Sequence, residues 1–184
     1  GAHSIARNVK LKMFLKKISL TNFRNHSSHK IKLLKNTTVL KGDNAQGKTN
    51  FLESIFFLAT GKPIKSDTDD EIVKFEETVV SVEGEIENSL GLCNLSTIIQ
   101  KTEEGLRKKF LVNGIARRLL DYSGNLVVVY FRPEDIDLVT GSPSLRREYV
   151  DQTIGQIDRD YRKVLSTYQK IVTQKNKLLK LIRE

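Results

Sequence analysis

The sequence contains a single cysteine and no long hydrophobic run. Because Cys93 has no second cysteine to pair with, an internal disulfide and a cysteine-built zinc site are excluded, which fits a reducing cytoplasm. We expect Cys93 to be a small core residue. No apolar run approaches the roughly 20 residues that a membrane span requires, so we expect a cytoplasmic protein without membrane contact.

Length and charge narrow the organisation and the partners. The 184 residues suffice for one full domain but not for two, so we expect one domain with an appendage. The net charge of +9 attracts polyanions, with nucleic acid as the first candidate; the alternative is that basic residues only solvate helix faces. Residues 1–12 are interpreted as a tag remnant and an extension before Met13.

A phosphate-binding motif occupies residues 42–49, whose sequence GDNAQGKT matches the pattern G-x-x-x-x-G-K-[ST]. The β-favouring run 37–40 before it and the apolar-periodic segment from Phe51 after it predict a strand, a loop and a helix in that order. The glycines let backbone N–H groups point at a phosphate, and a helix N-terminus favours an anion. We predict that Lys48 reaches the outer phosphates of a nucleoside triphosphate and that Thr49 binds Mg²⁺.

A polar connection at residues 21–26 joins two predicted neighbouring strands, 14–20 and 30–34. It contains Arg24 and Asn25, whose guanidinium and amide groups are suited to phosphate and to base or sugar edges. The alternative is a plain surface turn. Spacing alone favours the turn.

The helix after the motif is expected to end at Gly61. Glu53, one helical turn beyond Thr49, is interpreted either as support for a magnesium site or as an exposed helix position. The acidic segment 65–71 is expected to be a surface loop. Its aspartates lack the glycine and the terminal glutamate of a calcium loop, so metal binding is not favoured there.

Residues 78–118 have the pattern of an antiparallel β-meander, and Asn113-Gly114 is a strong hairpin signal. The apolar run 126–131 predicts a strand covered on both faces. Together these features favour a mixed sheet. Glu134 and Asp135 follow that strand and suggest a Walker B element, but Arg132 and Pro133 intervene, so a nucleotide-sensing loop or a subdomain junction is preferred.

The last 43 residues, 142–184, are expected to be a helical arm that follows a head lobe at 13–141. Ser142-Pro143 predicts a helix start, and a second start is expected near Asp158 after a break at Gly155. From there an a/d heptad seam, broken once by lysine, favours a coiled-coil arm over an amphipathic helix packed on the domain. The seam residues are Tyr161, Leu165, Tyr168, Val172, Lys175, Leu179 and Ile182.

Several motifs occur in a fixed order: residues 17–25, 42–50 with Glu53, 59–61, 112–114, 133–135, and 139–143 with Arg146 and Arg147. This ordered set closely resembles the amino-terminal head of the RecF family. The resemblance implies an α/β fold, an ABC-type P-loop ATPase head lobe related to SMC heads, with the start of a helical lobe. It also implies ATP and Mg²⁺ as cofactors and an ATP-dependent head-to-head homodimer.

The same resemblance implies DNA repair. RecF-like proteins bind DNA at single-strand/double-strand junctions, act with RecO and RecR and help to load RecA at gaps. Carried onto this sequence, it assigns Arg24 and Asn25 to the nucleotide and residues 133–135 to the Q-loop region, where no glutamine is present. The nucleotide-binding set is Gly42, Asn44, Ala45, Gln46, Gly47, Lys48, Thr49, Asn50, Arg24 and Asn25.

The sequence departs from the family pattern in two ways. No signature motif or Walker B copy is recognised in the sequence, so we expect weak nucleotide binding and poor hydrolysis. Pro63 and Lys65 stand where the family has a serine followed by an arginine.

A small-molecule P-loop kinase and an SMC-like chromosome-organising head remain alternatives. Expected DNA contacts are residues 107–109, 117–118 and 146–147, through phosphates rather than bases.

Overall fold

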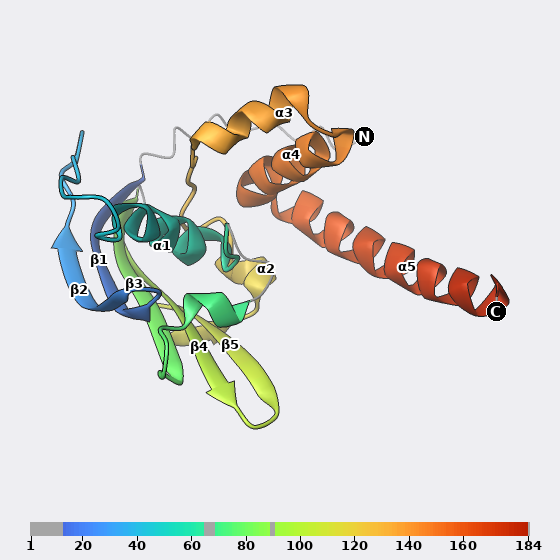
Figure 1. The fold of residues 1–184 in the computed structure, drawn as a ribbon, viewed down its shortest axis with the longest axis horizontal. Coiled ribbons are helices and arrows are strands. Elements are labelled where there is room, and N and C mark those ends of the chain that lie inside the picture. Colours follow the sequence, from blue (N-terminus) through green and yellow to red (C-terminus); the bar gives the residue numbers. More distant parts are fainter. Residues whose placement is uncertain (1–12, 65–68, 89–90, 184) are drawn as a thin grey trace.

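The fold is built on one sheet with helices on one side and a long helix that projects from the rest (Figure 1). The computed structural model describes residues 13–64, 69–88 and 91–183; the predicted extension at 1–12, Lys65 and the first part of the predicted loop 65–71 lie outside the described residues. The strands are β1 (Phe14–Phe23), β2 (His26–Lys32), β3 (Val79–Asn88), β4 (Gly91–Thr102), β5 (Gly105–Val112) and β6 (Ile115–Arg117). The helices are α1 (Lys48–Thr60), α2 (Leu119–Tyr122), α3 (Asp137–Thr140), α4 (Pro143–Ile157) and α5 (Arg159–Arg183), with 3-10 turns η1 (Asp69–Ile72) and η2 (Pro133–Ile136).

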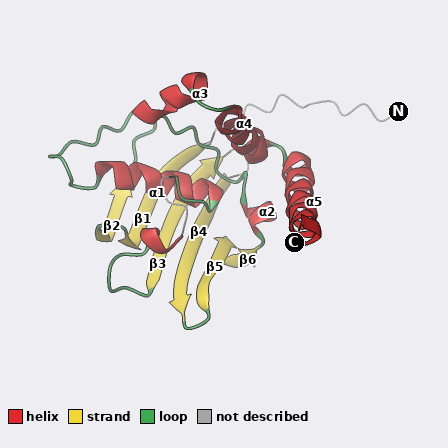
Figure 2. Cartoon of the chain, turned by 45° about the vertical axis from the view of Figure 1, so that its right-hand side comes forward, coloured by secondary structure: helices red, strands yellow, loops and turns green. Residues whose placement is uncertain are grey.

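The six strands pair in the order β2-β1-β3-β4-β5-β6, and α1 lies across one face of the sheet (Figure 2). The α/β class is confirmed, and strands β3 to β6 form the predicted meander. The expectation of a mixed sheet is wrong for the described residues, because every pairing among them is antiparallel. The β-favouring run and the apolar run that were predicted as further strands form none.

Those two runs, 37–40 and 126–131, have irregular backbone, which corrects both strand predictions. A strand needs a neighbour for its N–H and C=O groups, and no described strand pairs with either run. Val39 is 81% exposed. In the second run a buried side chain takes the place of a strand: Gln156 Nε2 donates to Val128 O at 3.1 Å, and Val128 N donates to Gln156 Oε1 at 2.9 Å.

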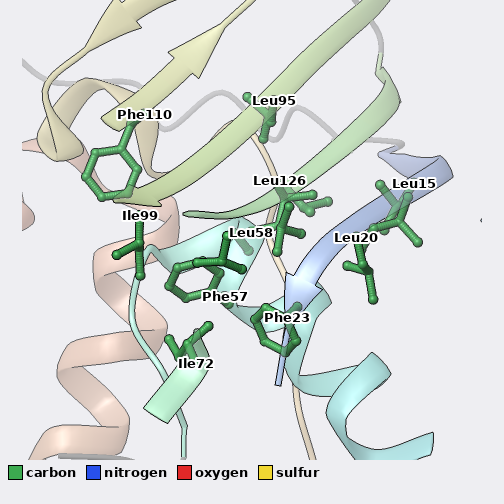
Figure 3. Packing of buried hydrophobic residues seen from close by; sticks show 14 of the residues in the cluster. Leu15, Leu20, Phe23, Phe57, Leu58, Ile72, Leu95, Ile99, Phe110 and Leu126 are labelled. Carbon is green, nitrogen blue, oxygen red and sulfur yellow. The ribbon is translucent and has the colours of Figure 1, made fainter. Parts of the chain in front are cut away.

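The core lies between the sheet and α1 (Figure 3). Alternate residues of β1 and β3 face the helix, as a period of two requires. The buried ones include Ile18, Leu20, Val80, Val82 and Ile86. Phe57 and Leu58 of α1 pack on them, and each such side chain stabilises the fold by about 1.5–3 kcal/mol. Gly84 allows this close approach, since a Cβ there would lie 2.5 Å from Leu58 Cδ2.

Three local predictions are confirmed. Asn113 and Gly114, with φ of 51° and 78°, form the tight turn between β5 and β6, as an Asn-Gly hairpin requires. Helix α1 ends at Gly61, whose φ of 67° lets its N–H bond Phe57 O at 2.8 Å. Cys93 belongs to the core, and burial raises the pKa of its thiol.

The carboxyl-terminal helices begin where the sequence predicts. Ser142 is the N-cap of α4, and Asp158 precedes α5, accepting a bond from Tyr161 N at 2.9 Å. The break falls at Asp158 rather than at Gly155, which lies inside α4. Only the first turns of α5 pack on the rest of the molecule: Tyr161 is half-buried, whereas Ile182 of the same heptad seam is 80% exposed. Most of α5 therefore projects away from the sheet (Figure 1).

Candidate functional site

The motif at residues 42–49 forms an exposed loop that ends on the N-terminus of α1. Ala45 and Gly47 have φ of 63° and 87°, a left-handed region that glycine adopts freely and alanine only at a cost. The first turn of α1 carries no acidic residue, so no side chain of that turn offsets the positive end of the helix dipole. The loop therefore has the backbone shape and the electrostatics of an anion site.

Lys48 lies along this loop. Its Nζ donates to Gly42 O at 2.6 Å and to Asp43 O at 2.5 Å, so one ammonium group reaches two carbonyls at the start of the motif. Thr49, beside it in the first turn of α1, is exposed. Among the described residues no cluster of three His, Cys, Asp or Glu side chains could hold a metal ion. A Mg²⁺ ion at Thr49 would thus rely on phosphate oxygens for much of its coordination.

The turn between β1 and β2 packs against the loop and the first turn of α1. His26 Nε2 donates to Gly47 O at 3.0 Å, and Asn50 Nδ2 donates to Asn25 Oδ1 at 2.8 Å. A Cβ on Gly47 would lie only 2.7 Å from side-chain atoms of Asn25 and His26. Gly47 is therefore required both for its φ and for the closeness of this turn.

Arg24 makes the third contact of the turn. Its Nε lies 3.0 Å from Oε2 of Glu53, and the two side chains are 18% and 3% exposed. Glu53 follows Gly47 and Asn50 at intervals of three, so these residues share one face of α1. The three successive residues 24–26 thus contact three positions along that face.

This arrangement corrects the predictions for the region. Only Arg24 and Asn25 separate the two strands, so the connection is shorter than the predicted 21–26. Glu53 is buried, so the exposed-position alternative is wrong. No pattern in the sequence indicated the contact of His26 with Gly47. The spacing of 47, 50 and 53 indicated a shared helix face, but no local pattern in β1 and β2 indicated what covers it.

Residues 132–135 do not form a Walker B element, because the run before them is not a strand. Asp135 Oδ2 accepts a bond from Arg132 N at 2.9 Å, and its Oδ1 lies 3.1 Å from Arg132 Nε. The carboxylate therefore stabilises its own 3-10 turn. Tyr130 connects the segment to α1, with its ring 6.2 Å from that of Phe56, and burial raises the pKa of Tyr130.

Several of the basic residues expected to contact DNA are engaged within the protein. Lys108 donates to Gly61 O at 2.8 Å, lies 2.6 Å from Asp69 Oδ1 and stacks over Phe57. It therefore fixes the end of α1 to η1. The neighbouring Asp70 pairs with Lys101 at 3.2 Å.

Two arginines of the same set are also engaged. Arg107 pairs with Glu104, and Arg146 Nη1 donates to Gly141 O at 3.0 Å, beside the end of α3. The remaining members of the set are exposed, and none of them forms an ion pair within the described residues. They are Lys109, Arg117, Arg118 and Arg147.

The chain belongs to the family of AAA ATPase domains, whose model matches residues 13–183. Within this class the resemblance to RecF is confirmed. The chain is 40% identical over 172 residues to the DNA replication and repair protein RecF of Geobacillus sp. (strain WCH70), and 42% identical over 169 residues to that of Streptococcus agalactiae serotype V. These matches cover 93% and 91% of the chain but only 45% of each relative, so the chain spans about half the length of these proteins.

Solved structures agree with this assignment. The recombination mediator protein RecF with ATP, from the RecFOR pathway, matches with a TM-score of 0.85 and 34% identity over 94% of this chain and 46% of that one. An SMC ATPase studied for its ATP-driven dimerisation matches at 16% identity with a TM-score of 0.60, over 76% of this chain and 98% of that one, and shares the fold. None of the described helices is long and apolar enough to cross a membrane.

Proposed function

We propose that this chain binds ATP with Mg²⁺ at residues 42–50 and forms the nucleotide-binding part of a RecF-type recombination mediator. The observation that carries the proposal is the loop itself, which has two left-handed residues and ends on a helix start that the 24–26 turn holds in place. The ATP complex of the similar RecF structure supports the choice of nucleotide. The chain's own residues fit a triphosphate in both charge and backbone shape.

Each residue has a distinct role in this proposal. The backbone N–H groups of residues 44–47 surround the phosphates, and Lys48 exchanges its carbonyl contacts for phosphate oxygens. Thr49 offers its hydroxyl to Mg²⁺. Arg24 uses Nε toward Glu53, so the terminal nitrogens of its guanidinium are the donors assigned to the nucleotide. Bound ATP with Mg²⁺ would supply a phosphoryl group whose transfer is promoted mainly by positioning and charge stabilisation.

The proposal extends to the whole protein. We assign residues 13–141 to a head lobe and 142–184 to the start of a helical lobe, and we expect two heads to associate when ATP is bound. DNA at single-strand/double-strand junctions, RecO and RecR are the proposed partners, with loading of RecA at gaps as the outcome, in the cytoplasm. Because no Walker B carboxylate or signature motif is recognised in the sequence, this chain alone is expected to hydrolyse ATP poorly.

The nucleotide assignment is tested by titrating a labelled ATP analogue against the chain and two variants. Lys48→Ala removes a charge-assisted contact, so the affinity should fall at least about tenfold. Lys62→Ala, which removes the same charge at the other end of α1, should bind as the parent does. Equal binding by parent and Lys48→Ala would refute the site, and rapid ATP turnover by the parent would refute the expectation of poor hydrolysis.

A further inference from the structure

The positive charge of the protein is concentrated on α5. This helix of 25 residues carries eight Lys and Arg side chains against one acid, Asp160, a net +7 out of the +9 of the whole chain. The rest of the molecule is nearly neutral. A polyanion would therefore be drawn to this helix rather than to the sheet, where most of the predicted contacts lie.

Three lysines of α5 form a line. Lys163, Lys170 and Lys177 recur every seven residues, so they lie on one side of the helix, about 10 Å apart along its axis. In the heptad whose a and d positions form the apolar seam, all three occupy position f, the position farthest from that seam. A helix that covered the seam would leave the lysines accessible.

These lysines are also available. All three are exposed, and none pairs with an acid within the described residues. The arginines at the start of the helix differ, because Arg159 lies 2.6 Å from Asp121 and Arg162 Nη1 donates to Gly155 O at 2.6 Å. Those two side chains fasten α5 to α2 and α4. Lys163 follows Arg162 directly and is exposed, and Lys170 and Lys177 continue the line toward the carboxyl-terminal end of α5, the end that projects in Figure 1.

We propose that Lys163, Lys170 and Lys177 form a contact track for the phosphates of a nucleic-acid duplex. The proposal rests on the DNA-binding function proposed above and names its site. Duplex DNA carries about one charge per 1.7 Å, so a line about 21 Å long faces several phosphates at once. Lysine offers point charges without a fixed geometry, so the track binds independently of base sequence. A lipid surface is a poorer match, since an amphipathic helix enters one through its apolar face, which points away from these lysines.

The test compares the parent chain with a variant in which Lys163, Lys170 and Lys177 are all replaced by glutamine, which keeps the helix propensity. Binding to a labelled duplex of about 30 base pairs is measured from about 50 to 200 mM salt. Each phosphate contact contributes about 0.9 to the slope of log affinity against log salt, so the variant should have a slope about 2.7 shallower. Circular dichroism checks that its helix content is unchanged.

A charge-matched control replaces Lys30, Lys32 and Lys35, at the β2 edge of the sheet, with glutamine. It should keep the slope of the parent. An unchanged slope in the α5 variant would overturn the track, because the three lysines would then make no phosphate contact. An equal loss of slope in the control would also overturn it, because the attraction would then be diffuse. Anionic vesicles that displace the duplex from the parent, but do not bind the α5 variant, would overturn it in favour of a lipid surface.

The nucleotide titration separates this proposal from the function on which it rests. If the parent binds the ATP analogue but no duplex, the track is refuted while the nucleotide site stands. If it binds the duplex with the expected slope but no nucleotide, the nucleotide site is refuted while the track stands.

Discussion

Replacing Glu53 with glutamine is expected to destabilise the protein by about 3 kcal/mol. The carboxylate is 3% exposed and lies 3.0 Å from Arg24 Nε, so the substitution leaves a largely buried guanidinium without its counter-charge. Removing one partner of a buried pair costs about 3–5 kcal/mol, and the lower value applies because Arg24, at 18% exposed, keeps some water. For a chain of this size the melting temperature should fall by about 6–12 °C.

The prediction is checked by urea unfolding followed by circular dichroism. Glu104→Gln is the matched control: its pair with Arg107 is exposed on both sides, so its unfolding free energy should change by less than about 0.5 kcal/mol. Combining Glu53→Gln with Arg24→Met completes a double-mutant cycle, in which a coupling of about 2 kcal/mol is expected. The double variant should thus be more stable than the sum of the two single losses implies.

Two results would refute the reasoning. If Glu53→Gln unfolds at the same urea concentration as the Glu104→Gln control, the ion pair does not hold the 24–26 turn on α1. If the effects of Glu53→Gln and Arg24→Met simply add, each side chain acts through other neighbours. A stable Glu53→Gln variant with weakened nucleotide binding would instead mean that the carboxylate orients Arg24 without stabilising the fold.

The remaining predictions concern the attachment of helices α4 and α5 to the rest of the molecule. Gln156→Leu leaves the N–H and C=O of Val128 without their partner, so the unfolding free energy should fall by about 2 kcal/mol, and an unchanged urea midpoint would contradict this. The hydrogen bond from Arg159 lowers the pKa of the Asp121 carboxyl in the folded protein. The contribution of this ion pair to folding stability is therefore complete above the unfolded pKa of about 3.9 and is lost as pH falls through the lower folded pKa. Asp121→Asn should therefore be less stable than the parent near pH 6 and equally stable at strongly acidic pH; a stability gap that widened on acidification would exclude the ion pair as its cause.

The elements that the sequence predicted correctly are those set by neighbouring residues. Alternating apolar residues marked β3, Asn113-Gly114 marked a hairpin turn, and Gly61 marked the end of α1. Each depends on the conformational preferences of a few consecutive residues. The β-favouring run 37–40 and the apolar run 126–131 also have strand preferences, yet neither is a strand, because a strand also needs a hydrogen-bonding neighbour and no described strand pairs with them.

The loop at residues 42–49, which we propose binds phosphate, was predicted from the sequence alone, because the motif places its glycines and a helix start within eight residues. What holds that loop was decided only by the tertiary structure. His26 and Glu53 lie far apart in the chain, and their contacts with Gly47 and Arg24 exist only because the β1–β2 turn folds onto one face of α1. The same distinction applies to α5. Its net charge follows from the sequence, whereas the packing of its first turns against α2 and α4 decides which of its basic side chains form ion pairs or hydrogen bonds within the protein.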